Sequence, residues 1–230
     1  MTTSEGPQDA GHHHGHGHGA GHGHEHGHDH HGNPPDFGEY LGKLEDPGRD
    51  EWQRPDEVVA ALGLREGQVA CDIGVGPGYF ARRLAAAVGS SGWVFGVDVE
   101  PRMLGVLAER LQAWELRNVT PVLGLPGDPL LPPASCDLIL MVNAYHHFPD
   151  GPASLRRLSA SLKPGGRLVN IDFHKRELPM GPPPAHKISR EEFLAQVAQA
   201  GLRVTAEHTF LPDQYFLELK PTDPPSTQKP

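Results

Sequence analysis

The chain has 230 residues, which is enough for one domain of ordinary size with terminal extensions. Its 29 acidic and 20 basic side chains give a formal net charge of −9, and such a surface repels the phosphate backbone of nucleic acids. The first residues lack an apolar leader, and no apolar run approaches the ~20 residues of a membrane span, so we expect a cytoplasmic protein without nucleic-acid or membrane partners. Both cysteines lie in apolar runs, and we expect them to be buried free thiols.

Glycine and histidine dominate residues 1–35, which contain almost nothing that could pack into a core, and a disordered tail is predicted there. Imidazoles on a flexible chain can gather around Zn²⁺, Ni²⁺ or Cu²⁺ without much selectivity. A biological role for these divalent metal ions and merely incidental binding both stay open. The tail holds 11 of the 16 histidines, namely His12, His13, His14, His16, His18, His22, His24, His26, His28, His30 and His31.

Residues 36–220 alternate between strand and helix patterns, and a disordered tail is predicted over 221–230. Pro101 is typical of a first helical turn, Gly89 of a helix end, and Ser189 with Glu192 of a capping box. Helices are predicted over 54–64, 78–89, 100–116, 151–166 and 189–201. Strands are predicted over 68–75, 92–99, 118–124, 136–148, 167–173, 202–210 and 214–220. This alternation predicts an α/β fold with a doubly wound, mostly parallel sheet closed by an antiparallel pair.

The stretch CDIGVGPGYF links the first strand to the next helix, at the strand edge where ligands bind in such sheets. Its glycines differ from the dinucleotide fingerprint, because Tyr79 stands where the third glycine belongs. Asp98 ends the second strand, where a carboxylate can accept both ribose hydroxyls. Asp72 precedes the glycines and disfavours a pyrophosphate while suiting a cation. S-adenosylmethionine, with an adenosine, a sulfonium and an ammonium, fits this pattern.

The segments VACDIGVGPGYFARRLA, VFGVDVEPRML and LKPGGRLVNIDF together resemble the class I, Rossmann-like S-adenosylmethionine-dependent methyltransferases of the small-molecule type. The resemblance implies seven strands in the order 3-2-1-4-5-7-6, with the last pair antiparallel. It implies that the loop of Asp72, Gly74, Gly76 and Gly78 wraps the methionine half of the cofactor, that Asp98 holds the ribose and that Val99 touches the adenine. Asp128, or instead Leu125 or Gly127, would contact the adenine amino group, and Asn143 would lie nearest the sulfonium.

The stretch NAYHHF after the fourth strand supplies the candidate bases Tyr145, His146 and His147, and the two histidines are not distinguished at this stage. One histidine packing against the sheet, with positioning alone supplying the catalysis, is the competing interpretation. Trp52 is a candidate lid over the cofactor, and the basic loop 174–189 either attracts an acidic substrate or is simply solvated.

The predicted function is therefore transfer of a methyl group from S-adenosylmethionine to a small-molecule acceptor by in-line displacement. The alternative is a protein that stores or senses metal ions through the histidine tail and only binds the cofactor.

Overall fold

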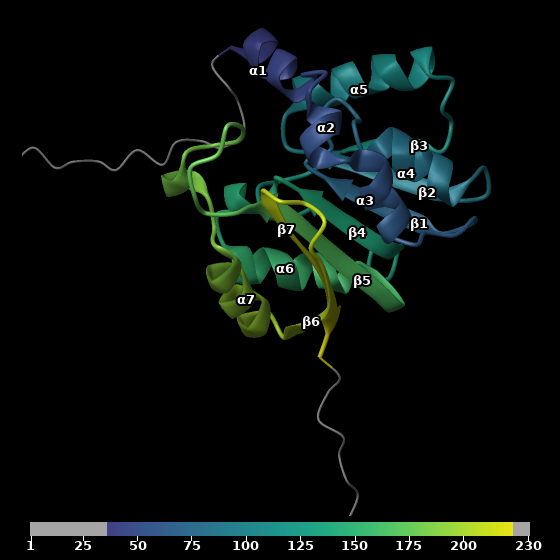
Figure 1. Cartoon of the computed structure of the whole chain (residues 1–230). Coiled ribbons are helices and arrows are strands. Elements are labelled where there is room, and N and C mark those ends of the chain that lie inside the picture. Colours follow the sequence, from purple (N-terminus) through teal and green to yellow (C-terminus); the bar gives the residue numbers. More distant parts are fainter. Residues whose placement is uncertain (1–35, 223–230) are drawn as a thin grey trace, which may run out of the picture. The chain divides into compact units, whose positions relative to one another are not determined.

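A computed structural model describes residues 36–222, and its centre is a sheet of seven strands (Figure 1). The predicted tails 1–35 and 223–230, with the eleven tail histidines, lie outside the described residues. The strands are β1 (Val69–Ile73), β2 (Trp93–Asp98), β3 (Val119–Leu123), β4 (Cys136–Val142), β5 (Leu162–Phe173), β6 (Leu202–His208) and β7 (Gln214–Pro221).

The strand order is β3-β2-β1-β4-β5-β7-β6, and β7 is antiparallel to both β5 and β6, while the other pairs are parallel. The predicted fold class and strand order are therefore confirmed. Because β1 and β4 are central and parallel, their carboxyl ends lie side by side at one edge of the sheet. The direction of connection reverses between these two strands, and a doubly wound sheet binds its ligand at that point.

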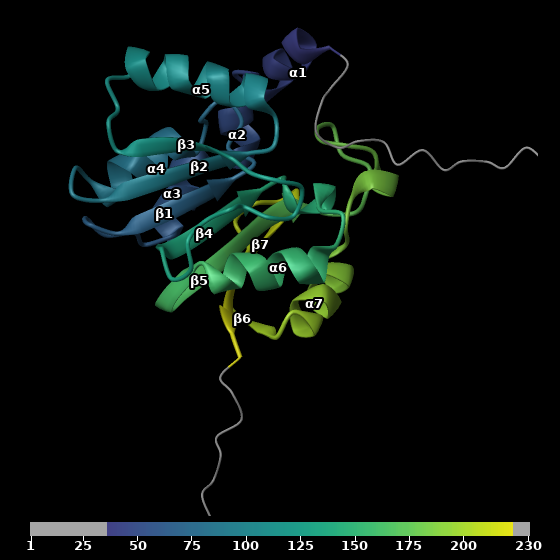
Figure 2. The same cartoon turned by 180° about the vertical axis from the view of Figure 1, so that it is seen from behind.

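Helices cover both faces of the sheet (Figures 1 and 2). The helices α3 (Pro55–Ala61), α4 (Ala81–Val88) and α5 (Pro101–Ala113) bury apolar side chains such as Leu84 and Leu107 against one face. On the opposite face lie α6 (Gly151–Ala160) and α7 (Arg190–Gln199), whose Leu155 and Phe193 are fully buried. Two apolar layers thus hold the strand ends in place.

Local sequence signals define most helix ends as expected. Pro101 occupies the first turn of α5, and Gly89 ends α4 with a positive φ of 67°. Ser189 and Glu192 form the predicted capping box at the start of α7, with each side chain accepting from the other residue's backbone N–H. Cys71 and Cys136 are free and buried, as expected from their apolar surroundings.

Three features differ from the sequence-based expectation. The strand β4 ends at Val142, because Asn143 adopts a left-handed φ of 54°, and Tyr145–His147 forms the short 3₁₀ helix η1. The strand β5 begins at Leu162, several residues before the expected start. Two further helices, α1 (Phe37–Leu44) and α2 (Arg49–Gln53), precede the first predicted one. None of the helices within residues 36–222 is long and apolar enough to cross a membrane.

Candidate active site

The glycine turn Gly74–Gly78 connects the carboxyl end of β1 to α4. Gly74, Gly76 and Gly78 all have positive φ values, of 71°, 54° and 92°. At Gly74 a Cβ atom would lie 2.9 Å from the Cβ atom of Ala144, so the turn and the segment that follows β4 are in close contact. The turn is also tied to β2, because the backbone N–H groups of Gly74 and Val75 both donate to the carbonyl of Val97.

Asp72 is almost fully buried at the end of β1. The pKa of its carboxyl is raised from the ordinary 3.8 to about 7, and burial is the largest cause. The guanidinium of Arg49 and a hydrogen bond from the backbone of Ala81 lower this pKa, whereas the carboxylate of Asp98 raises it. A carboxyl group with this pKa gains from any cation that a ligand brings to it.

Asp98 at the end of β2 faces the same turn. One carboxylate oxygen accepts from the N–H of Gly76 at 2.9 Å and the other from the N–H of Glu100 at 3.0 Å. Burial raises the pKa of Asp98, while these backbone hydrogen bonds lower it. Val99 follows, half-buried. The structure therefore brings Asp72, the glycine turn, Asp98 and Val99 together at neighbouring strand ends, as the spacing predicted.

Asp128 lies in a tight turn with Leu125, where the two backbones form a bridge. Its carboxylate accepts from the N–H of Leu130 at 3.0 Å and lies 3.8 Å from the guanidinium of Arg157. The backbone N–H and carbonyl of Leu125 are both used within this turn, and the carbonyl of Gly127 accepts from Arg157. All three candidates for the adenine contact therefore already have partners within the protein.

Asn143 belongs to a buried chain of polar side chains that joins β4 to β7 and α2. Its Oδ1 accepts from Nε2 of Gln214 at 2.7 Å, and Oε1 of Gln214 accepts from Nε2 of Gln53 at 3.1 Å. Oε1 of Gln53 in turn accepts from Nε of Arg49 at 2.7 Å. Gln53 and Gln214 are almost fully buried, so each needs the partners that the chain supplies.

His146 in η1 forms a buried pair with Asp172 near the end of β5. Its Nδ1 lies 3.0 Å from both carboxylate oxygens of Asp172, which also accepts from the N–H of Phe173. Because an ionised carboxylate only accepts hydrogen bonds, Nδ1 of a neutral imidazole must carry the proton and Nε2 must hold the free electron pair. This arrangement orients an imidazole for proton transfer.

The two neighbours of His146 lie in different surroundings. Tyr145 is fully buried, donates its hydroxyl to Oε1 of Gln196 at 2.5 Å, and packs edge-on against Phe148 and Phe193. Burial raises its pKa further above the already high value of a phenol. His147 is exposed, and its ring centroid lies 4.1 Å from that of His146. The geometry thus separates two histidines that the sequence left equivalent.

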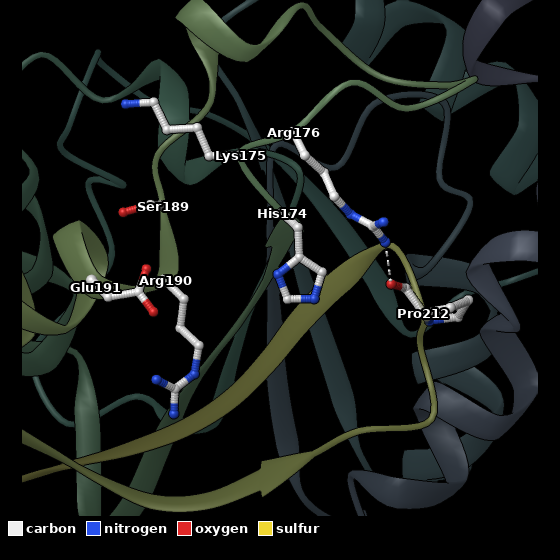
Figure 3. A pocket seen from close by; sticks show the side chains of 7 residues that line it. All are labelled: His174, Lys175, Arg176, Ser189, Arg190, Glu191 and Pro212. Carbon is white, nitrogen blue, oxygen red and sulfur yellow. Dashed lines mark hydrogen bonds between the residues drawn. The ribbon is translucent and has the colours of Figure 1, made fainter.

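The basic loop after β5 lines a pocket with the start of α7 and Pro212 (Figure 3). The cations in this pocket have carboxylate partners: Lys175 pairs with Glu192 at 3.0 Å and Arg176 with Asp213 at 2.9 Å. Burial and the charge of Arg176 lower the pKa of His174, which favours its neutral form. These ion pairs offset the attraction that the loop would otherwise exert on an acidic substrate.

The other two basic residues of the loop are placed differently. Lys187 is buried, with Nζ donating to the carbonyl of Arg176 at 2.8 Å and lying 5.5 Å from the ring of Phe173. His186 is exposed. The ring centroid of Trp52 lies 5.6 Å from that of Phe173, so the candidate lid residue packs against the end of β5.

Several residues of the site were missed by sequence reasoning, namely Arg49, Gln53, Asp172 and Gln214. Single polar residues in short helices and at strand ends have no local signature of their role. Only Asp172 had a usable signal, because a carboxylate in an otherwise apolar strand predicts a buried partner. Within residues 36–222 the structure contains no group of three or more side chains suited to hold a metal ion.

Comparisons with known proteins agree on one family. A family model described as a methyltransferase domain matches residues 70–166. The 2-phytyl-1,4-naphtoquinone methyltransferase of Nostoc punctiforme is 34% identical over 130 residues, covering 53% of this chain and 54% of that protein. A demethylmenaquinone methyltransferase of Staphylococcus aureus is 31% identical over 129 residues, covering 56% of this chain and 52% of that protein. The chain thus spans about half the length of these curated relatives.

A solved structure extends the similarity over most of the fold. The crystal structure of an S-adenosylmethionine-dependent methyltransferase from Aquifex aeolicus is 29% identical, with a TM-score of 0.75. The alignment covers 79% of this chain and 96% of that one. The similarity therefore supports the Rossmann-like methyltransferase fold with the strand order that places β1 next to β4.

Proposed function

Because the chain belongs to the class I S-adenosylmethionine-dependent methyltransferases, we propose that it transfers a methyl group from this cofactor to a small-molecule acceptor. The observation that supports this most strongly is the placement of two carboxyl groups, the buried Asp72 and the half-buried Asp98, beside a positive-φ glycine turn. Ribose hydroxyls and an amino-acid ammonium match this set of acceptors, while a pyrophosphate would meet two negative charges.

The residues present suit the cofactor. Asp98 would accept the ribose hydroxyls, and Asp72 would face the ammonium across a turn whose glycines let a ligand approach the backbone. Asn143 would lie closest to the reacting centre, and Val99 would contact the adenine. We assign no side chain to the adenine amino group, because the candidate Asp128 is already paired with Arg157. S-adenosylmethionine, when bound, supplies a methyl group on a positively charged sulfonium.

We propose His146 as the general base. Its pair with Asp172 would hold Nε2 unprotonated and ready to accept the proton that the acceptor loses on methylation. His147 would then lie beside the base without sharing its role, and Tyr145 would support η1 through its hydrogen bond to Gln196. An acceptor that has no proton to lose would need only the positioning that the site supplies.

The names of the relatives guide the choice of acceptor. Two of them are named as methyltransferases of naphthoquinone-type compounds, so reduced 1,4-naphthoquinones lacking a ring methyl group are the first acceptors to test. The aromatic rings of Trp52 and Phe173 at the end of β5 favour a planar acceptor. The alternative function, storage or sensing of metal ions, gains no support from the comparisons or from residues 36–222. A cytoplasmic location stays a prediction from sequence.

The test combines binding and turnover. Calorimetry should detect S-adenosylhomocysteine binding to the protein, and nicotinamide dinucleotides should not bind. Release of S-adenosylhomocysteine is then followed with naphthoquinols, phenols, amines and thiols as acceptors, and His146→Gln serves as the variant that lacks the proposed base. Tight binding of NAD, or failure to bind S-adenosylhomocysteine, would overturn the proposed function.

A further inference from the structure

Lys187 is a buried cation in the loop between β5 and α7, and the proposed function does not use it. It is 3% exposed, and none of the ion pairs within residues 36–222 includes it. An ammonium has three donors, and the one hydrogen bond that Nζ makes to the described residues goes to the carbonyl of Arg176 at 2.8 Å. A carbonyl satisfies one donor but carries no charge, so the burial of this ammonium is costly. The fold therefore holds a cation whose counter-charge the described residues do not supply.

The ammonium lies beside two aromatic rings at the carboxyl end of β5. Its Nζ is 5.5 Å from the ring centroid of Phe173, the last residue of this strand. The ring of Trp52 packs on the same phenyl ring, with 5.6 Å between the two centroids. A positive charge next to flat apolar surfaces suits a planar ligand that carries a negative charge at its edge.

This end of β5 adjoins the place proposed for the methyl group. Phe173 is paired with Gln214 across the antiparallel ladder of β5 and β7, and Nε2 of Gln214 donates to Oδ1 of Asn143 at 2.7 Å. Asp172, the preceding residue of β5, holds the proposed base. Because successive side chains of a strand point to opposite faces, the base and Lys187 approach the strand end from different faces. An acceptor bound across this end can contact both.

The other lysine and the arginine of the loop already have carboxylate partners. Lys175 is paired with Glu192 at 3.0 Å and Arg176 with Asp213 at 2.9 Å, and both cations line the open pocket of Figure 3. Neither can bind a new anion without competing with its own carboxylate. Lys187 can do so, because its one described partner is an uncharged carbonyl.

We propose that Lys187 binds the ionised oxygen of an aromatic hydroxyl acceptor whose ring lies against Trp52 and Phe173. This inference rests on the proposed function and adds the chemical class of the acceptor, namely phenols and enols that ionise. An oxyanion supplies the missing counter-charge and accepts a charge-assisted hydrogen bond from a donor that the described residues leave unused. A neutral amine or ether would leave the charge unpaired, so the site discriminates against such compounds.

The test compares two stable naphthoquinones by calorimetry on the protein saturated with S-adenosylhomocysteine. 2-Hydroxy-1,4-naphthoquinone is an acidic enol that is ionised at neutral pH, and its 2-methoxy analogue has the same rings but cannot ionise. The wild-type protein should bind the hydroxy compound about 10- to 100-fold more tightly, the range expected for a charge-assisted pair. Lys187→Met should reduce this preference to about twofold or less by weakening the binding of the hydroxy compound alone. Lys187→Arg should retain part of the preference, because it keeps the positive charge.

Lys175→Met is the matched control, because it removes a lysine of the same loop that is paired with Glu192. This variant should keep the wild-type preference. Equal affinity of the wild-type protein for the two naphthoquinones, or binding of neither, would overturn the assignment of Lys187 while leaving the proposed function intact, and this measurement needs no variant. Equal weakening of both compounds in Lys187→Met would also overturn it, because a lysine that only supports the loop would affect them alike. Failure of S-adenosylhomocysteine to bind would instead contradict the proposed function itself.

Discussion

Replacing Asp72 with Asn should stabilise the ligand-free protein. Burial raises the pKa of this carboxyl from its ordinary 3.8 to about 7 in the folded state. Between these two pH values the unfolded chain has released a proton that the folded protein still holds, so folding becomes less favourable as the pH rises. Each pH unit in this interval costs about 1.4 kcal/mol, so the ionised carboxylate costs roughly 4 kcal/mol above pH ~7.

Asn has nearly the same shape as Asp, keeps an acceptor for the backbone of Ala81, and cannot ionise. The variant should therefore be more stable by about 2–4 kcal/mol at pH ~8, and its advantage should shrink towards pH ~4. Urea unfolding of both proteins at several pH values measures this difference. The same change should weaken S-adenosylhomocysteine binding at least ~10-fold, because the ligand ammonium loses its counter-charge. A gain in stability with a loss of affinity would show that Asp72 is retained for binding.

Asp137 is the matched control for this experiment. Its partial burial raises the pKa, but hydrogen bonds from Lys163 at 2.7 Å and from the backbone of Val69 at 2.8 Å hold it below the ordinary range. Asp137→Asn should therefore destabilise the protein at neutral pH, and the loss should fade as the pH falls. The reasoning would be refuted if the unfolding free energy of Asp72→Asn at pH ~8 were equal to or below that of the wild type. It would also be refuted if the gain in unfolding free energy did not change with pH.

Three further predictions concern the other groups. Asp98→Ala should weaken S-adenosylhomocysteine binding by about 1–3 kcal/mol in calorimetry, because ribose hydroxyls lose their acceptor, and unchanged affinity would contradict its assigned role. His146→Gln should lower turnover by about 10²–10⁴-fold and abolish the rise of rate with pH, while cofactor affinity stays nearly unchanged. His147→Gln should have little effect on turnover, and equal turnover rates in the two variants would leave positioning alone to explain catalysis. Deleting residues 1–32 should abolish the binding of several Ni²⁺ or Zn²⁺ ions, and in the full chain this binding should weaken below pH ~6.5 as the imidazoles become protonated. The melting temperature of the shortened protein should barely change, and a large drop would show that the tail packs on the domain.

Local patterns in the sequence were sufficient to predict the fold. Buried strands alternating with amphipathic helices imply a doubly wound sheet, and the resemblance implied the strand order that the structure confirms. The spacing from Asp72 through the glycines to Asp98 placed these residues at neighbouring strand ends, because parallel strands connected by helices bring their carboxyl ends to one edge. The capping box of Ser189 could also be predicted from the sequence, since a cap involves only a few consecutive residues.

The tertiary structure alone decided how the polar residues pair. Gln53 and Gln214 are 161 positions apart, and His146 and Asp172 are 26 apart, so no local pattern could connect either pair. The same applies to Arg49, which looks like any charged helix residue in the sequence and becomes a buried cation only when α2 packs over the glycine turn. Sequence periodicity reports which face of an element is apolar. Which polar groups meet behind that face depends on how distant strand ends and helices pack together, because burial removes water and leaves only neighbouring side chains as partners.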